Sequence, residues 1–465
     1  MGETKKLGLG SGIAVCVGLI LATSCLLSLG YGVGLAGASF ILPLFVVLIL
    51  NSFIAFSFAE LHSLMPSVNG GVGQYTLVGM GPVASIFSNT AVYVITMILA
   101  SSVELSMCGL VLSDLFPQIP ALSFSMVVLL ILFTLNLFGL NVFSKVQNLV
   151  VILLLGSIVV LGVISFFRLI PERAIPAQEI ETPAVVGLGG VMGLSAIAFW
   201  LFIGVEFIIP VAKDLKKPRR DVILSMILAL LILFVVQAVM GVGMTHYVAL
   251  SELSASEMPH MAFAEALLGP AGRVWMGIVT LLAGASTLNT VLPSTARILQ
   301  GMGEENLVPR SFTKVNKKNV PVLGMLLILV VDTLLLVTGF VNSSGMVNII
   351  LAASCFWLTS YILTHTNVLI LRRRYPDLPR YKKLMLLGLP QILGIAGNVY
   401  MIWNISDDMD NRITIYKIFG IIFVLLAAYS VIWVKFALKT RLFKPLPIER
   451  LNSPPHHLLE PEKEA

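Results

Sequence analysis

The chain has 465 residues, of which 57% are hydrophobic and 12% are charged, with a net charge of +6 and a mean hydropathy of +0.96. A soluble domain cannot bury that much apolar surface, so the composition predicts an all-α polytopic membrane protein. The net charge does not indicate a nucleic-acid partner, because the Lys and Arg residues gather in particular loops between apolar segments. All the cysteines lie in apolar segments, which indicates packed thiols and not disulfides.

A membrane-spanning helix needs roughly 20 apolar residues, and by that measure the chain contains about twelve spans. The predicted spans are residues 10–34, 38–62, 83–112, 123–141, 147–167, 190–212, 222–247, 274–299, 320–341, 346–371, 384–403 and 413–436. Residues 1–438 therefore form one transmembrane domain, and residues 439–465 form a charged, Pro-rich cytoplasmic tail predicted to be disordered. Residues 254–268 are too short to span and form either a loop or, as we favour, an amphipathic helix over the outer mouth.

The distribution of cations between the loops predicts the orientation. Loops after odd-numbered spans contain few cations, namely Arg168, Arg173, Arg273 and Arg412. Loops after even-numbered spans contain most of them, namely Lys213, Lys216, Lys217, Arg219, Arg220, Arg310, Lys314, Lys317, Lys318, Arg372, Arg373, Arg374, Arg380, Lys382 and Lys383. The positive-inside rule then places both termini in the cytoplasm. An even number of spans independently requires the two termini to lie on the same side. The expected location is the plasma (inner) membrane.

The sixth span has an unusual sequence for a lipid-embedded helix. It reads A-I-A-F-W-L-F-I-G-V-E-F-I-I-P, with Gly204, Glu206 and Pro210 in its second half. Gly and Pro weaken the helical hydrogen bonds, and a carboxylate at membrane depth is unfavourable unless it faces protein or water. The pattern favours a solute-binding helix of a transporter. The alternative is a kinked structural helix in which Glu206 pairs with a neighbour.

Several other spans contain polar residues at mid-depth. The first span contains Ala22, Thr23 and Ser24, whose hydroxyl groups either bind a solute or serve helix packing. Glu104 in the third span either binds a cationic group or, as we favour, pairs near the outer surface. Asp332 in the ninth span has no obvious partner in the sequence.

Patterns for catalysis and cofactor binding are absent from the sequence. The histidines have no metal-ligand spacing, and no P-loop is present, so we expect no cofactor and no ATP-driven step. A membrane-embedded enzyme is not indicated, because paired acid and base groups are missing. Transport would depend on a gradient or on exchange.

Three separated stretches carry a family resemblance. The first, from Phe58 to Tyr75, reads F-A-E-L-H-S-L-M-P-S-V-N-G-G-V-G-Q-Y. The second joins F-W-L-F-I-G-V-E to K-D-L-K-K-P-R-R-D, ending at Asp221. The third, from Ser286 to Pro309, begins S-T-L-N-T-V-L-P-S-T-A-R. Together they resemble the amino acid–polyamine–organocation transporters, most of all arginine–agmatine-type antiporters and exporters of methionine and branched-chain amino acids.

The resemblance implies the leucine-transporter fold, with spans one to five and six to ten as inverted repeats followed by two further helices. Spans one and six would be unwound at mid-membrane. The implied substrate pocket consists of Ala22, Thr23, Ser24, Phe199, Trp200, Phe202, Ile203 and Gly204. Glu206 matches an acid implicated in proton sensing, and Glu104 is a second candidate for proton coupling or amine contact. Ser286 and Thr287 are candidates for a sodium site, since hydroxyl and carbonyl oxygens suit hard cations; we rank sodium below proton coupling or exchange.

The sequence departs from the family pattern at three places. Ala22-Thr23-Ser24 replaces a Gly-small-Gly triplet, which narrows the room for a substrate carboxylate beside the backbone. Val291 replaces a tryptophan that stacks on guanidinium, and Leu154 replaces a lysine of proton-coupled members. We therefore predict a secondary transporter of amino acids or small organic amines that works by alternating access. A sensor or channel on the same scaffold is the alternative, although polar residues are too sparse for a continuous pore.

Overall fold

The computed structural model describes residues 7–66, 68, 71–139, 147–171, 183–185, 187–341, 345–378, 380 and 386–451. Within these ranges the chain is mainly helical, and an isolated parallel bridge joins Leu7 to Leu215. The first half contains α1 (Leu9–Ile20), α2 (Thr23–Ala36), η1 (Gly37–Phe40), α3 (Ile41–Leu64), α4 (Val72–Met80), α5 (Pro82–Thr90), η2 (Ala91–Thr96), α6 (Met97–Leu115), α7 (Ala121–Leu137) and α8 (Gln147–Phe166).

The second half begins with α9 (Leu188–Gly193), α10 (Ser195–Trp200), η3 (Val205–Asp214), α11 (Pro218–Met244), α12 (Leu250–Ala255), α13 (Pro259–Leu268), α14 (Pro270–Glu304) and η4 (Arg310–Thr313). It continues with α15 (Val322–Val337), α16 (Gly345–Arg374), η6 (Leu386–Gly388), α17 (Leu389–Trp403), α18 (Met409–Ile432), η7 (Trp433–Ala437) and α19 (Ile448–Leu451). Each of the predicted spans corresponds to one of these helices or to a consecutive group of them.

The lengths of the helices agree with a polytopic membrane protein. Among the described residues, 8 helical stretches are long and apolar enough to cross a membrane. One of them, Thr23–Leu64, has 42 residues because it joins half of the first predicted span to the second. The remaining predicted spans correspond to shorter helices, including α7, α15 and the 15-residue α17. The residues outside the described ranges on which predictions were made are Gly70, Asn141, Arg173, Lys382, Lys383, Leu384 and residues 452–465.

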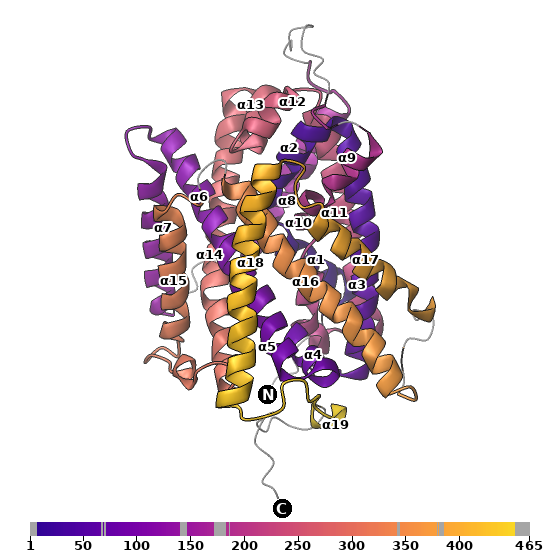
Figure 1. The fold of residues 1–465 in the computed structure, drawn as a ribbon. Helices are drawn as coiled ribbons and strands as arrows, with labels where there is room; N and C mark the ends of the chain where they lie inside the picture. Colours follow the sequence, from indigo (N-terminus) through magenta and orange to yellow (C-terminus); the bar gives the residue numbers. More distant parts are fainter. Residues whose placement is uncertain are drawn as a thin grey trace, which may run out of the picture.

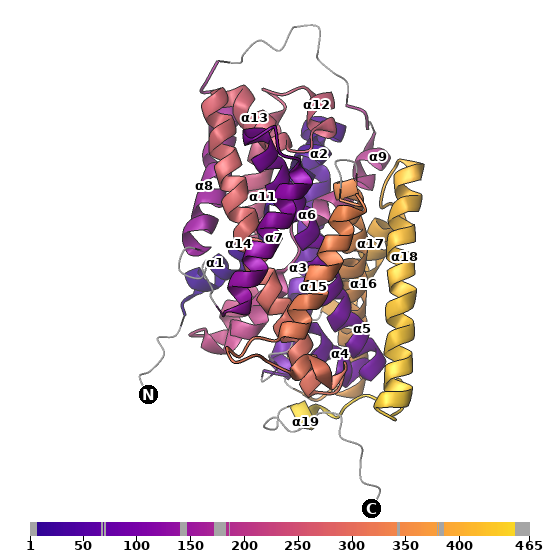
Figure 2. The same ribbon diagram turned by 90° about the vertical axis from the view of Figure 1, so that its left-hand side faces the viewer.

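The helices stand side by side, and the first predicted span is divided between α2 in the upper half of the bundle and α1 below it (Figure 1). In the sixth predicted span, α9 lies in the upper half and η3 contacts α1. In both views α2 and α9 lie in the upper half, with α12 and α13 at the top, whereas α1 lies lower and α4 and α19 lie at the bottom (Figure 2). The interruptions of the two spans are therefore close to the middle of the bundle, where a solute site of a transporter is expected.

Most of the stretch 254–268 is helical, as we favoured, but as two elements: residues 254–255 end α12, residues 256–258 are irregular, and α13 follows. Pro259 packs on Gly30 of α2, where it would clash with any side chain. His260 is fully buried and shares a hydrogen bond of 2.9 Å with the Thr280 hydroxyl of α14. Burial lowers the pKa of His260 to about 3, so its ring is neutral at physiological pH. This cap fastens α2 to α14.

The lower end of the bundle is closed by a buried ion pair. Arg372, in the last turn of α16, donates from Nε and Nη2 to the two carboxylate oxygens of Glu60 at 2.9 and 2.6 Å. The Glu60 side chain is 1% exposed and the Arg372 side chain 11%. Arg374 adds hydrogen bonds to the carbonyl oxygens of Val78 and Gly79 in α4. The end of α16 is thereby tied to α3 and α4.

Part of the stretch that we expected to be a disordered tail lies against this same end. Leu446 donates its backbone N–H to the Leu77 carbonyl at 3.1 Å, and the Leu442 carbonyl accepts from the Val83 N–H at 3.4 Å. Leu446 and Ile448 are buried. Residues 442–448 of the predicted tail therefore pack against α4 and α5, although the charge and proline content of the stretch gave no sign of these apolar contacts.

Arg372→Ala should lower the stability of the purified protein by about 3 kcal/mol, because it leaves the buried Glu60 carboxylate without its bidentate partner. Thermal melting in detergent measures the change. The matched control is Arg373→Ala, which removes an exposed neighbour and should melt like the wild type. Equal melting temperatures for the two variants would show that the ion pair does not hold this end together.

Candidate functional site

The first predicted span is interrupted between Ile20 and Thr23. Leu21 and Ala22 are extended, with φ/ψ of −78°/104° and −123°/164°, and they separate α1 from α2. The break leaves the first N–H groups of α2 without carbonyl partners in the preceding turn. The interruption implied by the family resemblance is thus present, and Thr23 and Ser24 are the first two residues after it.

The sixth predicted span is interrupted between Trp200 and Val205. The helix α10 ends at Trp200, residues 201–204 form a turn, and the chain continues as the 3-10 helix η3. Gly204 has a φ of +103°, a conformation that L side chains rarely adopt. The prediction that Gly204 marks a weakened helix is therefore confirmed, and Pro210 lies inside η3.

The Glu104 carboxylate of α6 binds the N-terminus of α2. Its Oε1 accepts the backbone N–H of Ser24 at 2.9 Å, and its Oε2 accepts the Thr23 hydroxyl. The expectation that Glu104 pairs near the outer surface is wrong, because the residue is fully buried at the break. A carboxylate is stabilised at this position by the freed N–H groups and by the positive end of the helix dipole.

The carbonyl groups freed at the second break are held by side chains from other helices. Gln237 of α11 donates to the Leu201 carbonyl at 3.0 Å, and Asn51 of α3 donates to the Phe202 carbonyl at 3.1 Å. These two amides were not predicted from the sequence. Each lies in a largely apolar span, and this was a usable signal, because a buried amide needs hydrogen-bond partners.

The two interruptions contact each other directly. Trp200 Nε1 donates to the Ser24 hydroxyl at 3.1 Å, and Cys25 Sγ lies 3.8 Å from the Trp200 carbonyl. Thr23 and Ser24 are buried, as are Phe199, Trp200, Phe202 and Ile203, whereas Ala22 is half-buried. The two breaks therefore meet through Ser24, Cys25 and Trp200. We call the predicted pocket residues together with Glu104 the break cluster: Ala22, Thr23, Ser24, Glu104, Phe199, Trp200, Phe202, Ile203 and Gly204.

Glu206 lies below the break and belongs to a separate network. Its Oε1 accepts from Trp357 Nε1 at 2.9 Å and its Oε2 accepts from the Tyr361 hydroxyl at 2.8 Å, both in α16. The rings of Phe199 and Tyr361 are in edge contact, with centroids 5.7 Å apart. The carboxylate thus connects η3 to α16. Trp357 and Tyr361 were not identified from the sequence, since nothing local links them to Glu206, which lies 151 and 155 positions away.

The other polar candidates do not join the break cluster by any hydrogen bond recorded among the described residues. At Ser286, in the middle of α14, the Thr290 hydroxyl donates to the backbone carbonyl at 3.0 Å. Thr287 is half-buried on the same helix. Asp332 accepts from Ser101 of α6 at 2.9 and 3.0 Å, which supplies the partner that its sequence context lacked. The sodium site at Ser286 and Thr287 stays a prediction.

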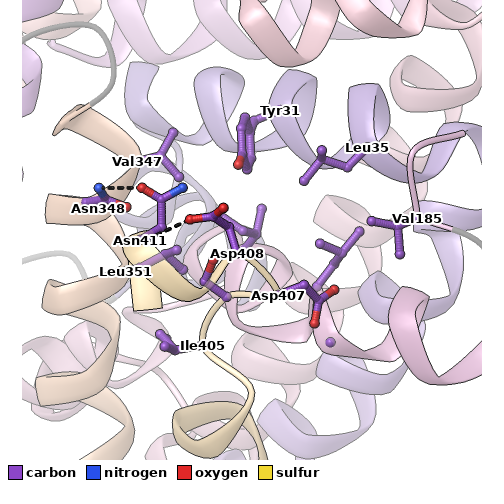
Figure 3. A pocket seen from close by; sticks show the side chains of 14 residues that line it. Tyr31, Leu35, Val185, Val347, Asn348, Leu351, Ile405, Asp407, Asp408 and Asn411 are labelled. Atoms are coloured by element: carbon purple, nitrogen blue, oxygen red, sulfur yellow. Dashed lines mark hydrogen bonds between the residues drawn. The ribbon is translucent and has the colours of Figure 1, made fainter. Parts of the chain in front are cut away.

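A cavity of about 180 Å³ opens beside the upper halves of the interrupted spans. Tyr31 of α2 and Ile197 of α10 line it together with Asp407 and Asp408, which precede α18 (Figure 3). Asp408 caps α18 by accepting the Asn411 N–H at 2.7 Å. Among the described residues that line this outer cavity there are two carboxylates and no Lys, Arg or His.

Comparison with known proteins identifies similar sequences over most of the chain. The sequence profile of the family described as "Amino acid permease" matches residues 7–437. A branched-chain amino acid permease of Bacillus subtilis is 25% identical over 405 residues, which cover 82% of this chain and 83% of the relative. A D-serine/D-alanine/glycine transporter of Escherichia coli is 22% identical, with 67% of this chain and 68% of the relative covered.

A solved structure has a similar fold. The crystal structure of an Eremococcus coleocola manganese transporter mutant superposes with a TM-score of 0.58, at 14% identity, over 92% of this chain and 94% of the other. At that identity the likeness concerns the fold alone, and it confirms the predicted leucine-transporter-type arrangement of an all-α polytopic membrane protein.

Gly204→Ala should lower stability by about 1–3 kcal/mol, because a side chain is strained at this backbone conformation. The added Cβ would also lie 3.1 Å from the Phe207 ring. Thermal melting in detergent provides the measurement. Gly156→Ala in α8 is the control, since its Cβ would meet open space. A Gly204 variant as stable as the Gly156 variant would mean that the second break does not require glycine.

Proposed function

The chain belongs to the amino acid permease family, and we propose that it carries amino acids or small organic amines across the plasma membrane by alternating access. It is a multi-pass membrane protein and a transporter, and the family match favours a permease over an enzyme, a channel or a sensor. The observation that carries the proposal is the direct contact between two interrupted helices in the middle of the bundle, Trp200 Nε1 to the Ser24 hydroxyl. Interrupted spans expose peptide groups at mid-membrane, where a polar solute needs partners.

Alternating access requires one end of the bundle to open while the other is closed. The buried Glu60–Arg372 pair holds the lower end closed, whereas the outer cavity reaches down to Ile197 of α10 at the opposite end. We propose that the described conformation is occluded and faces the outer side, with solute entering through this cavity. Separation of α16 from α3 and α4 would then release the solute at the lower end.

We propose that the lower end is cytoplasmic, with both termini on that side. The loop that contains Lys216 pairs with Leu7 near the start of the chain, through hydrogen bonds of 2.8 and 2.9 Å. Arg374 at the end of α16 binds carbonyl oxygens of α4. Leu77 of α4 also binds residue 446, and Val83 of α5 binds residue 442, both near the other terminus. Cation-rich loops favour the cytoplasmic side.

The break cluster is proposed as the substrate site, with Trp200 as its aromatic wall. Reconstituted protein should take up labelled amino acids or amines with saturation, and uptake should accelerate when unlabelled solute is present on the opposite side. Trp200→Ala should reduce this exchange at least about tenfold through lost packing and the lost Ser24 bond. The control is Trp403→Ala, since that side chain is 73% exposed. Uptake that does not saturate would indicate a channel.

Glu206 is proposed as the group that couples transport to protons. The titratable and polar groups facing it are Tyr361 and Trp357 of α16, Tyr93 of η2 and Cys16 of α1. No Lys, Arg or His ion pair with Glu206 occurs among the described residues. Protonation of the carboxylate would weaken its ability to accept the hydrogen bonds from Trp357 and Tyr361. The connection between η3 and α16 would change as a result.

Glu206→Gln should flatten the dependence of uptake on pH between about 5 and 8, because the amide has no proton to exchange in that range. Initial rates in proteoliposomes at fixed membrane potential provide the measurement. Asp332→Asn is the matched control, being another buried carboxylate bonded to neutral donors, and should keep the wild-type profile. If the Gln variant follows the wild-type curve, Glu206 has no part in coupling.

A further inference from the structure

We propose that the transported solute is a small organic cation without a carboxylate group, and that Glu104 is the residue that sets this preference. The inference chooses between the two solute classes of the proposed transport function and rests on that function. It follows from the contacts of Glu104, from the chemistry of the second break, and from the charge of the outer cavity.

The N-terminus of α2 already holds a carboxylate. Both oxygens of Glu104 accept from the first two residues of the helix, the Thr23 hydroxyl and the Ser24 N–H. These groups are the ones that a solute carboxylate at the first break would need. A second anion placed there would have to displace Glu104 or lie beside a buried negative charge.

The surroundings of Glu104 leave little room for a second anion. Gly284 of α14 faces the carboxylate so closely that a Cβ on it would lie 3.5 Å from Glu104 Oε2 and 2.7 Å from Cys108 Sγ. Glu104 forms no ion pair with Lys, Arg or His among the described residues. Two carboxylates would therefore repel each other without a cation between them, in a region that excludes water.

The second break provides groups that suit an ammonium. The carbonyl oxygens of Leu201 and Phe202 each accept one hydrogen bond from a neutral amide, which leaves a second lone pair on each. Phe199 and Trp200 supply aromatic faces, which attract cations. The side chains that serve this break, Asn51 and Gln237, direct donors to the carbonyls and add no positive charge.

The outer cavity also favours cations over anions. Asp407 and Asp408 lie at its wall, and Figure 3 shows both carboxylates among the lining side chains. The charged residues that follow them in the first turn of α18 are Asp410 and Arg412, and Arg412 Nε donates to the Ser406 carbonyl at 2.6 Å. Carboxylates outnumber the guanidinium here, and such an entrance concentrates cations.

The test compares amino acids with the amines that remain when their carboxylate is removed. Full-length protein in proteoliposomes is offered leucine against isoamylamine, serine against ethanolamine, and ornithine against putrescine. For at least one pair, the amine should be taken up with at least about tenfold higher efficiency than its parent amino acid. Glu104→Gln keeps the shape and removes the charge, so the ratio of amine to amino acid efficiency should fall at least about tenfold.

Asp332→Asn is again the control and should leave the ratio unchanged. The ratio is measured within each variant, so differences in expression cancel, and the comparison in the wild-type protein stands if the Glu104 variant fails to fold. Saturable uptake of the amino acids with exclusion of the amines overturns this inference and leaves the transport function intact. No saturable uptake of either class overturns the transport function and the inference with it.

Discussion

Peptide groups inside a bilayer have no water to bind, and every N–H and carbonyl released by a broken helix must find a partner within the protein. This constraint organises the centre of the molecule. Glu104 binds the start of α2, Gln237 and Asn51 bind carbonyls of the turn after α10, and Ser24 binds the indole of Trp200. Helices from both halves of the chain are thereby fastened to the two breaks.

In the proposed cycle, the groups that bind the solute and the groups that close the lower end are different parts of the molecule. The break cluster is closed and lies among helices that its own hydrogen bonds hold in place, whereas the lower end is held by an ion pair in which the Glu60 side chain is 1% exposed. Glu206 stands between them, bonded to Trp357 and Tyr361 of the helix whose last turn contains Arg372. In the proposed cycle, a change at Glu206 would act on α16, the element whose movement would open the lower end.

Local patterns in the sequence predicted much of this structure. They could not predict the hydrogen bonds between residues that lie far apart in the chain. Apolar run lengths located the helices, and the Gly204–Glu206–Pro210 pattern identified the second break because a single helix carries its whole signal. The position of Glu104 was misjudged, since its partners lie 80 and 81 residues away on another helix. The roles of Asn51 and Gln237 depend on which carbonyls the breaks release, and that is decided only when α3, α10 and α11 pack together.

The central claim is that solute binds where the two interrupted helices meet. An experimental structure with saturating transported solute tests it most directly. The account predicts that the solute occupies the space between Ala22–Ser24 and Trp200–Gly204, with its amino group toward the carbonyl oxygens of the second break. Solute bound elsewhere, with the hydrogen bonds of Glu104 and Trp200 unchanged, would contradict it.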